Sequence, residues 1–228
     1  MKKINKTDEP DSLVQHKANR PSLFSNLPLA TKEALRQSLL FEQGHICCYC
    51  MKRIPEKVET NSGDTGMKIE HFKCQERFPQ LQLTYSNLFG ACKGGEGMPK
   101  KLQTCDTKKA NADLIINPLL DAPNCEALFK YTAEGEILSL NDDEEINRQL
   151  NVVLNLNMQN LKDARREVYL EVQRRVENES KRIASRQIRV GFFEQEKNNW
   201  LTKTDNRFRP YCMVAVYYLN KKIKQNQV

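Results

Sequence analysis

The stretch GACKGGEGMPKKLQTCD, residues 90–106, holds Cys92 and Cys105 at the two ends of a loop of 12 residues that contains three glycines and one proline. A second stretch, CCYC at residues 47–50, has the C-x-x-C spacing that lets two thiolates bind one ion. Zinc prefers four such ligands in a tetrahedron, and clustered cysteines without an export signal favour metal over disulfides. We therefore predict a structural Zn²⁺ bound by Cys47, Cys50, Cys92 and Cys105.

Composition alone leaves the second cysteine pair open, because the chain has eight cysteines. Cys92 and Cys105 are favoured because each lies where a loop is expected to meet a helix. The alternative to a zinc site is a set of four buried thiols, since free cysteine is often buried as a small hydrophobic residue. The other candidates for the second pair are Cys74, Cys125 and Cys212.

The acid–histidine pair Glu70–His71 lies in MKIEHF (67–72); 15 residues separate His71 from Asn87, and 18 separate Asn87 from Asp106. Removing about ten residues of the glycine-rich loop would bring its two flanking cysteines to C-x-x-C spacing. The same deletion would bring Asn87 and Asp106 to a separation of eight. One insertion explains both spacings, so we interpret this segment as an inserted loop.

Taken together, CCYC, IEHF, YSNLFGAC and CDTKK resemble the HNH endonuclease module, a ββα-metal fold often braced by a zinc clasp of two C-x-x-C pairs. The HNH pattern has an acid–histidine pair at the end of the first strand and an asparagine in the following loop. A third polar residue, commonly histidine, follows near the start of the helix. The matching positions are Glu70–His71, Asn87 and Asp106, and Asp106 departs from the pattern. The resemblance implies an α+β protein with a zinc-braced ββα-metal (HNH) nuclease core.

Phosphodiester hydrolysis requires an activated water and stabilisation of the phosphate and the leaving oxygen, which one Mg²⁺ (or Mn²⁺) ion can supply. Imidazole is suited to take the proton from water, so His71 is the predicted general base. Glu70, Asn87 and Asp106 are predicted oxygen ligands of the catalytic ion. Neighbouring side chains on a regular strand point to opposite faces. Glu70 and His71 can therefore both reach one ion only if the strand ends or bends at His71.

Further motifs extend the resemblance to the PtuB proteins of Septu and retron-linked antiphage systems, over roughly residues 1–170: C-x-Y-C, Y-x-NL, CD-x-K-K, FKYTAEGEI and LNLN. This resemblance implies a DNA-cleaving effector that works with a PtuA-type ATPase. In retron-linked versions, a reverse transcriptase and its msDNA would join the assembly. Two alternatives remain: the same site acting on RNA such as tRNA, or a non-catalytic zinc-clasp adaptor that binds nucleic acid or a partner.

We expect three regions along the chain. Residues 1–43 form a lead-in and a helix, 44–120 the nuclease module with its zinc clasp, and 121–228 a hairpin with a helical, basic C-terminal region packed on the core and on a partner. In the first half of the chain we expect an extended segment over 1–30, a helix over 31–43 capped by Thr31 and ended by Gly44, and a turn over 61–66. A helix with Asp106 as its cap is expected from residue 105, and a hairpin around Glu134–Gly135. Helices are expected over 142–191, interrupted by LNLN (154–157), and a last helix or strand over 208–222.

The positive charge of the chain belongs to its C-terminal part. Residues 162–228 contain 16 Lys and Arg against 8 Asp and Glu, whereas residues 1–161 contain 20 against 21. Such a surplus favours polyanions, although a solvated helix face explains it equally well. Apolar runs are far shorter than the roughly 18 residues that a membrane helix needs. We therefore expect a cytoplasmic protein without a membrane segment.

Overall fold

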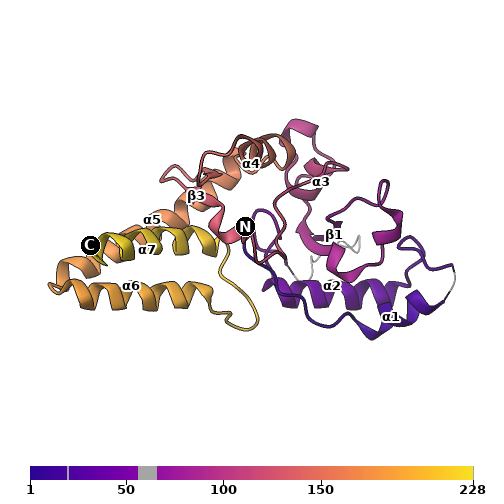
Figure 1. Ribbon diagram of the computed structural model, residues 1–228, viewed down its shortest axis with the longest axis horizontal. Coiled ribbons are helices and arrows are strands. Elements are labelled where there is room, and N and C mark those ends of the chain that lie inside the picture. Colours follow the sequence, from indigo (N-terminus) through magenta and orange to yellow (C-terminus); the bar gives the residue numbers. More distant parts are fainter. Residues whose placement is uncertain (20, 56–65, 228) are drawn as a thin grey trace.

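The computed structural model describes residues 1–19, 21–55 and 66–227, and it mixes helices with two small antiparallel sheets (Figure 1). This confirms the predicted α+β class. The turn predicted over 61–66 lies outside the described residues, except for Gly66. In chain order the elements are α1 (Asp11–Ala18), α2 (Leu29–Gln43), β1 (Met67–His71), the 3₁₀ turns η1 (Pro79–Leu81) and η2 (Tyr85–Asn87), β2 (Leu88–Cys92), η3 (Lys100–Leu102), α3 (Cys105–Lys109), η4 (Cys125–Ala127), β3 (Phe129–Tyr131), β4 (Ile137–Ser139), α4 (Glu144–Arg148), the π-helical turn η5 (Gln149–Val153), α5 (Gln159–Arg182), α6 (Arg186–Leu201) and α7 (Cys212–Gln227).

Strands β1 and β2 form the hairpin that carries the acid–histidine pair. Glu70 lies opposite Phe89 and His71 opposite Leu88. All five residues of β2 are buried, because this strand lies between α2 and α3. The main hydrophobic core therefore runs directly beneath Glu70 and His71.

Helix α2 confirms the helix predicted over 31–43, but its start differs. It begins at Leu29, after Pro28, so Thr31 lies inside the first turn and is buried instead of capping the helix. The fixed φ of Pro28 suits a helix start, and its carbonyl accepts a hydrogen bond from Lys32 N at 2.9 Å. Gly44 ends the helix as predicted, with φ of 56°. A Cβ at this position would also lie 2.4 Å from the Phe208 ring. Both the positive φ and this close contact therefore favour glycine.

The prediction of an extended segment over residues 1–30 is wrong. Helix α1 follows Pro10, and Met1, Ile4 and Leu13 are all buried in the main core. Ile4 N donates to Pro118 O at 2.9 Å, which ties the N-terminal residues to the chain beyond α3. In sequence, these buried apolar residues are widely spaced among polar residues and prolines, so they form no periodic pattern that would predict a packed segment.

Helix α3 is one turn long, whereas the sequence predicted a longer helix capped by Asp106. It ends at Lys109, because Ala110 has a positive φ of 48°. Thr104 occupies the N-cap position, and no side chain caps the helix. Asp106 lies in the first turn with its carboxylate turned toward other partners, described below. The short helix thus presents Asp106 and Lys109 on the same face.

Helices α5, α6 and α7 lie side by side at one end of the molecule (Figure 1). The predicted interruption at LNLN and the β3–β4 hairpin are confirmed, and the last element is a helix. Arg165 of α5 is almost fully buried and donates to Gly135 O at 2.6 Å and Leu156 O at 2.8 Å. Gly135, with φ of 83°, permits this contact, because a Cβ there would lie 2.0 Å from Lys162 O.

Among the helices of the described residues, none has the length and apolar character needed to cross a bilayer.

Candidate metal centres and catalytic cluster

The four predicted zinc ligands converge in the structure. The sulfur atoms of Cys47, Cys50, Cys92 and Cys105 all lie within 4.8 Å of one another. Cys92 Sγ is 3.8 Å from Cys50 Sγ and 3.7 Å from Cys105 Sγ. A tetrahedral zinc with Zn–S bonds of about 2.3 Å requires sulfur–sulfur edges of about 3.8 Å. The cluster therefore has the donor set and spacing of a structural zinc site.

The CCYC segment is held in a tight turn by its backbone. Met51 N donates to Cys47 O at 3.0 Å, and Cys47 N donates to Lys52 O at 2.9 Å. Cys48 N donates to Gly90 O at 3.0 Å, which fastens the turn to β2. The turn thus places the first ligand pair against the strand that ends in the third ligand, Cys92.

The inserted loop brings the second ligand pair together. Thr104 N donates to Gly94 O at 2.8 Å, so the two ends of the loop meet next to the cysteines. A Cβ at Gly94 would lie 2.2 Å from Thr104 O, and its φ of 54° also favours glycine. Cys105 N donates to Leu154 O at 2.9 Å, so the LNLN segment helps to fix the last ligand.

The sulfur cluster is also electrostatically distinct. Burial alone would raise the pKa of Cys47, but hydrogen bonds from Cys105 and the other neighbouring thiols lower it well below its usual range. A thiolate is the form that binds metal. The other four cysteines are buried free thiols outside the cluster: Cys48, Cys74, Cys125 and Cys212.

Glu70 and Asp106 form a carboxyl pair in which Glu70 is buried and Asp106 is half-buried. Glu70 is 2% exposed. Burial raises the pKa of Glu70 well above its usual range, and the neighbouring Asp106 raises it further. Burial would also raise the pKa of Asp106, but its hydrogen bond with Glu70 and the ammonium group of Lys68, 3.0 Å away, lower it. Two carboxyl groups placed together offer the oxygen donors that a hard divalent cation prefers.

Two donors hold the Glu70 carboxylate from the protein side. Tyr49 OH donates to Glu70 Oε1 at 2.6 Å, and Lys109 Nζ lies 2.8 Å from the same oxygen. Lys109 Nζ also donates to His71 O at 3.1 Å and is completely buried. The carboxylate is therefore fixed in place by the CCYC turn and by α3.

His71 is the last residue of β1, so the strand ends where it must end if Glu70 and His71 are to reach one ion. Its Nε2 lies 3.0 Å from Gln82 O, which only an N–H can satisfy, so Nδ1 carries the lone pair. Gln75 Nε2 lies 3.3 Å from Nδ1, and the edge of the Phe24 ring packs on the imidazole. Burial lowers the pKa of His71, which favours the neutral ring.

Asn87 has a different place from the one predicted. Its Oδ1 accepts a hydrogen bond from Lys73 N at 2.8 Å, and its Nδ2 donates to Lys73 O at 3.0 Å and Leu81 O at 3.2 Å. Its backbone carbonyl accepts from Phe72 N at 2.9 Å. In this arrangement Asn87 fixes the loop that follows His71, and its oxygen is engaged by the backbone instead of facing the carboxyl pair.

The structure adds Tyr49, Gln75 and Lys109 to the residues singled out from the sequence for this cluster. The sequence offered one signal for Lys109, since it lies three residues after Asp106 and shares its helix face. In sequence, Lys109 is one of two neighbouring lysines typical of a solvated helix face, and the other, Lys108, is exposed in part and donates to Lys100 O. Nothing in the sequence marks Tyr49 as a partner of Glu70, because 20 residues separate them.

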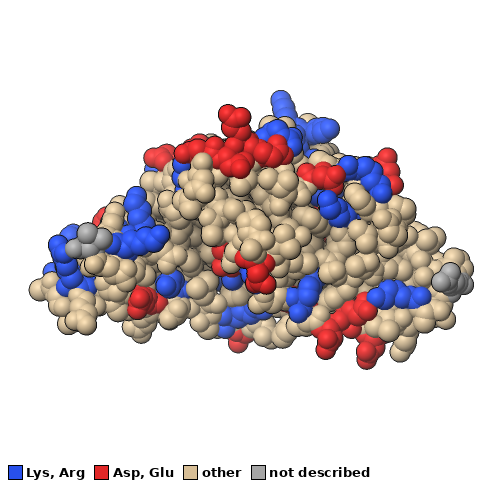
Figure 2. Space-filling view, in the orientation of Figure 1, with Lys and Arg blue, Asp and Glu red and all other residues tan. Residues whose placement is uncertain are grey.

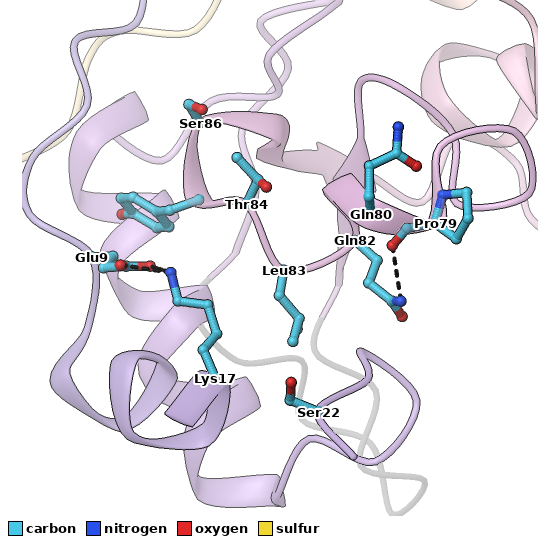
Figure 3. A pocket seen from close by; sticks show the side chains of 10 residues that line it. Glu9, Lys17, Ser22, Pro79, Gln80, Gln82, Leu83, Thr84 and Ser86 are labelled. Carbon is cyan, nitrogen blue, oxygen red and sulfur yellow. Dashed lines mark hydrogen bonds and ion pairs between the residues drawn. The ribbon is translucent and has the colours of Figure 1, made fainter. Parts of the chain in front are cut away.

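The carboxyl pair does not line the cavity next to the 79–86 segment. This cavity, of about 560 Å³, lies on the outer side of the 79–86 loop, with the Glu9–Lys17 ion pair on its opposite wall (Figure 3). It shares Gln82 with the surroundings of His71, but none of the predicted site residues lines it.

No protein-family model matches the chain. Three curated proteins are similar to it. It is 28% identical over 138 residues to the Septu protein PtuB of Bacillus thuringiensis. The aligned segment covers 59% of this chain and 49% of that protein. It is 33% identical over 109 residues to a protein of retron Vc95 from Vibrio cholerae serotype O1 biovar El Tor, covering 46% and 47%, and 30% identical over 126 residues to a protein of retron Ec83 from Escherichia coli, covering 49% and 46%.

The two retron proteins are named, provisionally, as HNH endonucleases. These matches confirm the resemblance to PtuB and HNH endonucleases that the sequence motifs indicated. The chain spans about half the length of the curated relatives it matches.

Proposed function

We propose that this chain is a metal-dependent HNH endonuclease that hydrolyses phosphodiester bonds in DNA. Strands β1 and β2 with helix α3 would form its ββα core, and the four cysteines would brace that core with zinc. The observation that carries the proposal is the pairing of Glu70, which directly precedes His71 at the end of β1, with Asp106, which directly follows Cys105 of the zinc-compatible cluster. The names of the three relatives support the same reaction class.

His71 is the general base of this proposal. Its Nε2–H donates to Gln82 O, which orients the ring and leaves Nδ1 to accept a proton from water. Gln75, an exposed side chain, holds the position next to Nδ1 and would give it up to that water. Asn87 keeps the loop carrying these partners in register with β1.

Glu70 and Asp106 are the residues that would hold Mg²⁺ or Mn²⁺. When bound, such an ion stabilises the charge on the phosphate and on the leaving oxygen. The carboxyl pair fits a divalent cation because its two side chains supply oxygen donors at one place. The buried Lys109 pairs with Glu70, and the partly exposed Lys68 pairs with Asp106. Asn87 is assigned to positioning in place of the ligand role expected from its sequence position.

The relatives' names place them in Septu and retron systems, so we propose that this chain also serves antiphage defence. A PtuA-type ATPase is the proposed partner, and a reverse transcriptase with its msDNA would join in a retron-linked assembly. Lys and Arg side chains gather at the end of the molecule formed by α5 and α7, and acidic side chains over α4 (Figure 2). This basic end is compatible with a nucleic-acid or partner contact.

Nuclease activity is tested by incubating the protein, with and without the neighbouring ATPase and ATP, with plasmid DNA and with total tRNA. Each reaction is run in Mg²⁺ and in EDTA. Cleavage of plasmid that requires Mg²⁺ supports the proposal, and cleavage of tRNA alone would move the substrate class to RNA. A protein that cuts neither pool under any condition, yet still binds a partner, would be the zinc-clasp adaptor.

Replacing Asp106 with asparagine is expected to weaken divalent-cation binding. The substitution keeps the size of the side chain but removes the charge that faces Glu70, and cation affinity should fall by about tenfold or more. Mn²⁺ titration followed by electron paramagnetic resonance measures this directly. Asp113→Asn is the matched control, because Asp113 forms an ion pair with Arg77 at 2.8 Å outside the cluster. Equal affinities in the two variants would contradict the assignment of Asp106.

A further inference from the structure

Tyr49 connects the two metal centres through a single side chain. It is the third residue of CCYC, so its backbone lies between Cys48 and Cys50. Its side chain is 1% exposed and crosses to β1, where its hydroxyl donates to Glu70 Oε1 at 2.6 Å. The path from a cysteine of the zinc-compatible cluster to the carboxyl pair is therefore one residue long.

The backbone of Tyr49 has little freedom to move independently of the cysteines. Lys52 N donates to Cys50 Sγ at 3.4 Å, and Met51 N donates to Cys47 O at 3.0 Å. Cys48 N is fastened to β2 through Gly90 O. The positions of the sulfur atoms and of the Tyr49 hydroxyl are thus set by the same turn.

The hydroxyl acts on one oxygen of Glu70 only. Tyr49 OH donates to Oε1, and Lys109 Nζ lies 2.8 Å from the same oxygen. Two donors on one carboxylate oxygen fix the rotation of the group and leave the other oxygen for a cation shared with Asp106.

We propose that Tyr49 is a positioning residue that couples the zinc clasp to the divalent-cation site, by holding Glu70 in the orientation that binds the cation. The inference deepens the proposed function and rests on its assignment of Glu70 and Asp106 as cation ligands. It predicts that the cysteine cluster affects catalysis through a specific hydrogen bond, in addition to its effect on stability.

The test compares Tyr49→Phe with Tyr85→Phe in the full chain. Tyr85 is a matched control, because its hydroxyl also donates at 2.6 Å to a buried carboxylate, Glu42 Oε1, which lies outside the carboxyl pair. Each variant is assayed for zinc content, thermal unfolding and Mn²⁺ affinity. Tyr49→Phe is expected to retain its zinc and to bind Mn²⁺ about tenfold more weakly, the scale seen when partners of metal ligands are removed. Tyr85→Phe should bind Mn²⁺ like the wild type.

A double-mutant cycle separates positioning from a general loss of structure. If Tyr49 acts through Glu70, Tyr49→Phe should change the Mn²⁺ affinity little in a Glu70→Gln background. An unchanged Mn²⁺ affinity in Tyr49→Phe, equal losses in both tyrosine variants, or additive losses in the cycle would each overturn the inference. A wild-type protein that binds no Mn²⁺ would overturn it together with the cation site. If Mn²⁺ affinity depends on Tyr49 as expected but the protein cuts no nucleic acid, only the proposed nuclease function is refuted.

Discussion

Replacing His71 with alanine is expected to reduce the rate of DNA cleavage by about 10²–10⁴-fold, the usual contribution of a positioned general base. The imidazole is held by Gln82 O on one side and presents Nδ1 on the other, so no neighbouring side chain can take over proton transfer from the same place. Because the ring contributes no carboxylate oxygen, the affinity for Mn²⁺ should stay close to that of the wild type. A supercoiled-plasmid assay in Mg²⁺ measures the rate, and Mn²⁺ titration measures the affinity.

His16→Ala provides the control for this loss. His16 Nε2 also lies against a backbone carbonyl, that of Leu23 at 3.1 Å, but no predicted site residue touches it. The His16→Ala substitution removes an imidazole that also lies against a backbone carbonyl, but it leaves the proposed general base, His71, in place. Cleavage by His71→Ala at the rate of His16→Ala would exclude His71 as the base. Restored cleavage on addition of free imidazole to His71→Ala would support the assignment further.

Loss of one cluster cysteine is expected to have the largest effect on stability. Cys105→Ala should abolish zinc binding and lower the free energy of unfolding by about 4 kcal/mol or more, because zinc binding in small metal domains is folding free energy. For a chain of this size, that corresponds to a fall in Tm of roughly 10 °C. Zinc content by inductively coupled plasma mass spectrometry and unfolding followed by circular dichroism measure the two effects.

Cys48→Ala is the matched substitution for the zinc prediction. Cys48 is a buried neighbour in the same turn, but it is not among the four clustered sulfur atoms. Its replacement should leave one zinc per chain and cost about 1 kcal/mol, the typical effect of a point mutation. If Cys105→Ala and Cys48→Ala unfold alike and neither changes the zinc content, the four cysteines form an apolar cluster of thiols and not a clasp.

The features predicted correctly from sequence were those set by spacing. Cysteines that would be two residues apart without an inserted loop do meet in space, and Gly44 does end its helix. β1 ends at His71, which meets the condition that side-chain alternation sets for Glu70 and His71 to reach one ion. Such patterns are local, and they depend on backbone geometry that each short segment largely determines by itself.

The features missed depend on tertiary contacts. Lys109 looks like a solvated lysine in sequence, and only the arrival of Glu70 and the His71 carbonyl explains its complete burial. The helix that follows Asp106 was expected to continue, but Lys109 is drawn inward and Ala110 turns away with a positive φ. The side chain of Asn87 could equally serve a cation or a loop, and its choice of backbone partners appears only in three dimensions.

The closed base of the 93–104 loop has a consequence for how this protein can change. Thr104 N donates to Gly94 O, so the two ends of the loop are held together beside the cysteines. Within the loop, Glu96 pairs with Lys68, and Lys101 O accepts from Asn155. Once the ends of a flexible loop are held, each doubling of its length costs only about 0.6 kcal/mol. Segments of other lengths, or a short peptide, could therefore be grafted between Gly95 and Gln103 while the loop ends stay joined next to Cys92 and Cys105. The inserted loop is therefore a place on the surface where the length and sequence of the chain can vary without changes to the hydrophobic core.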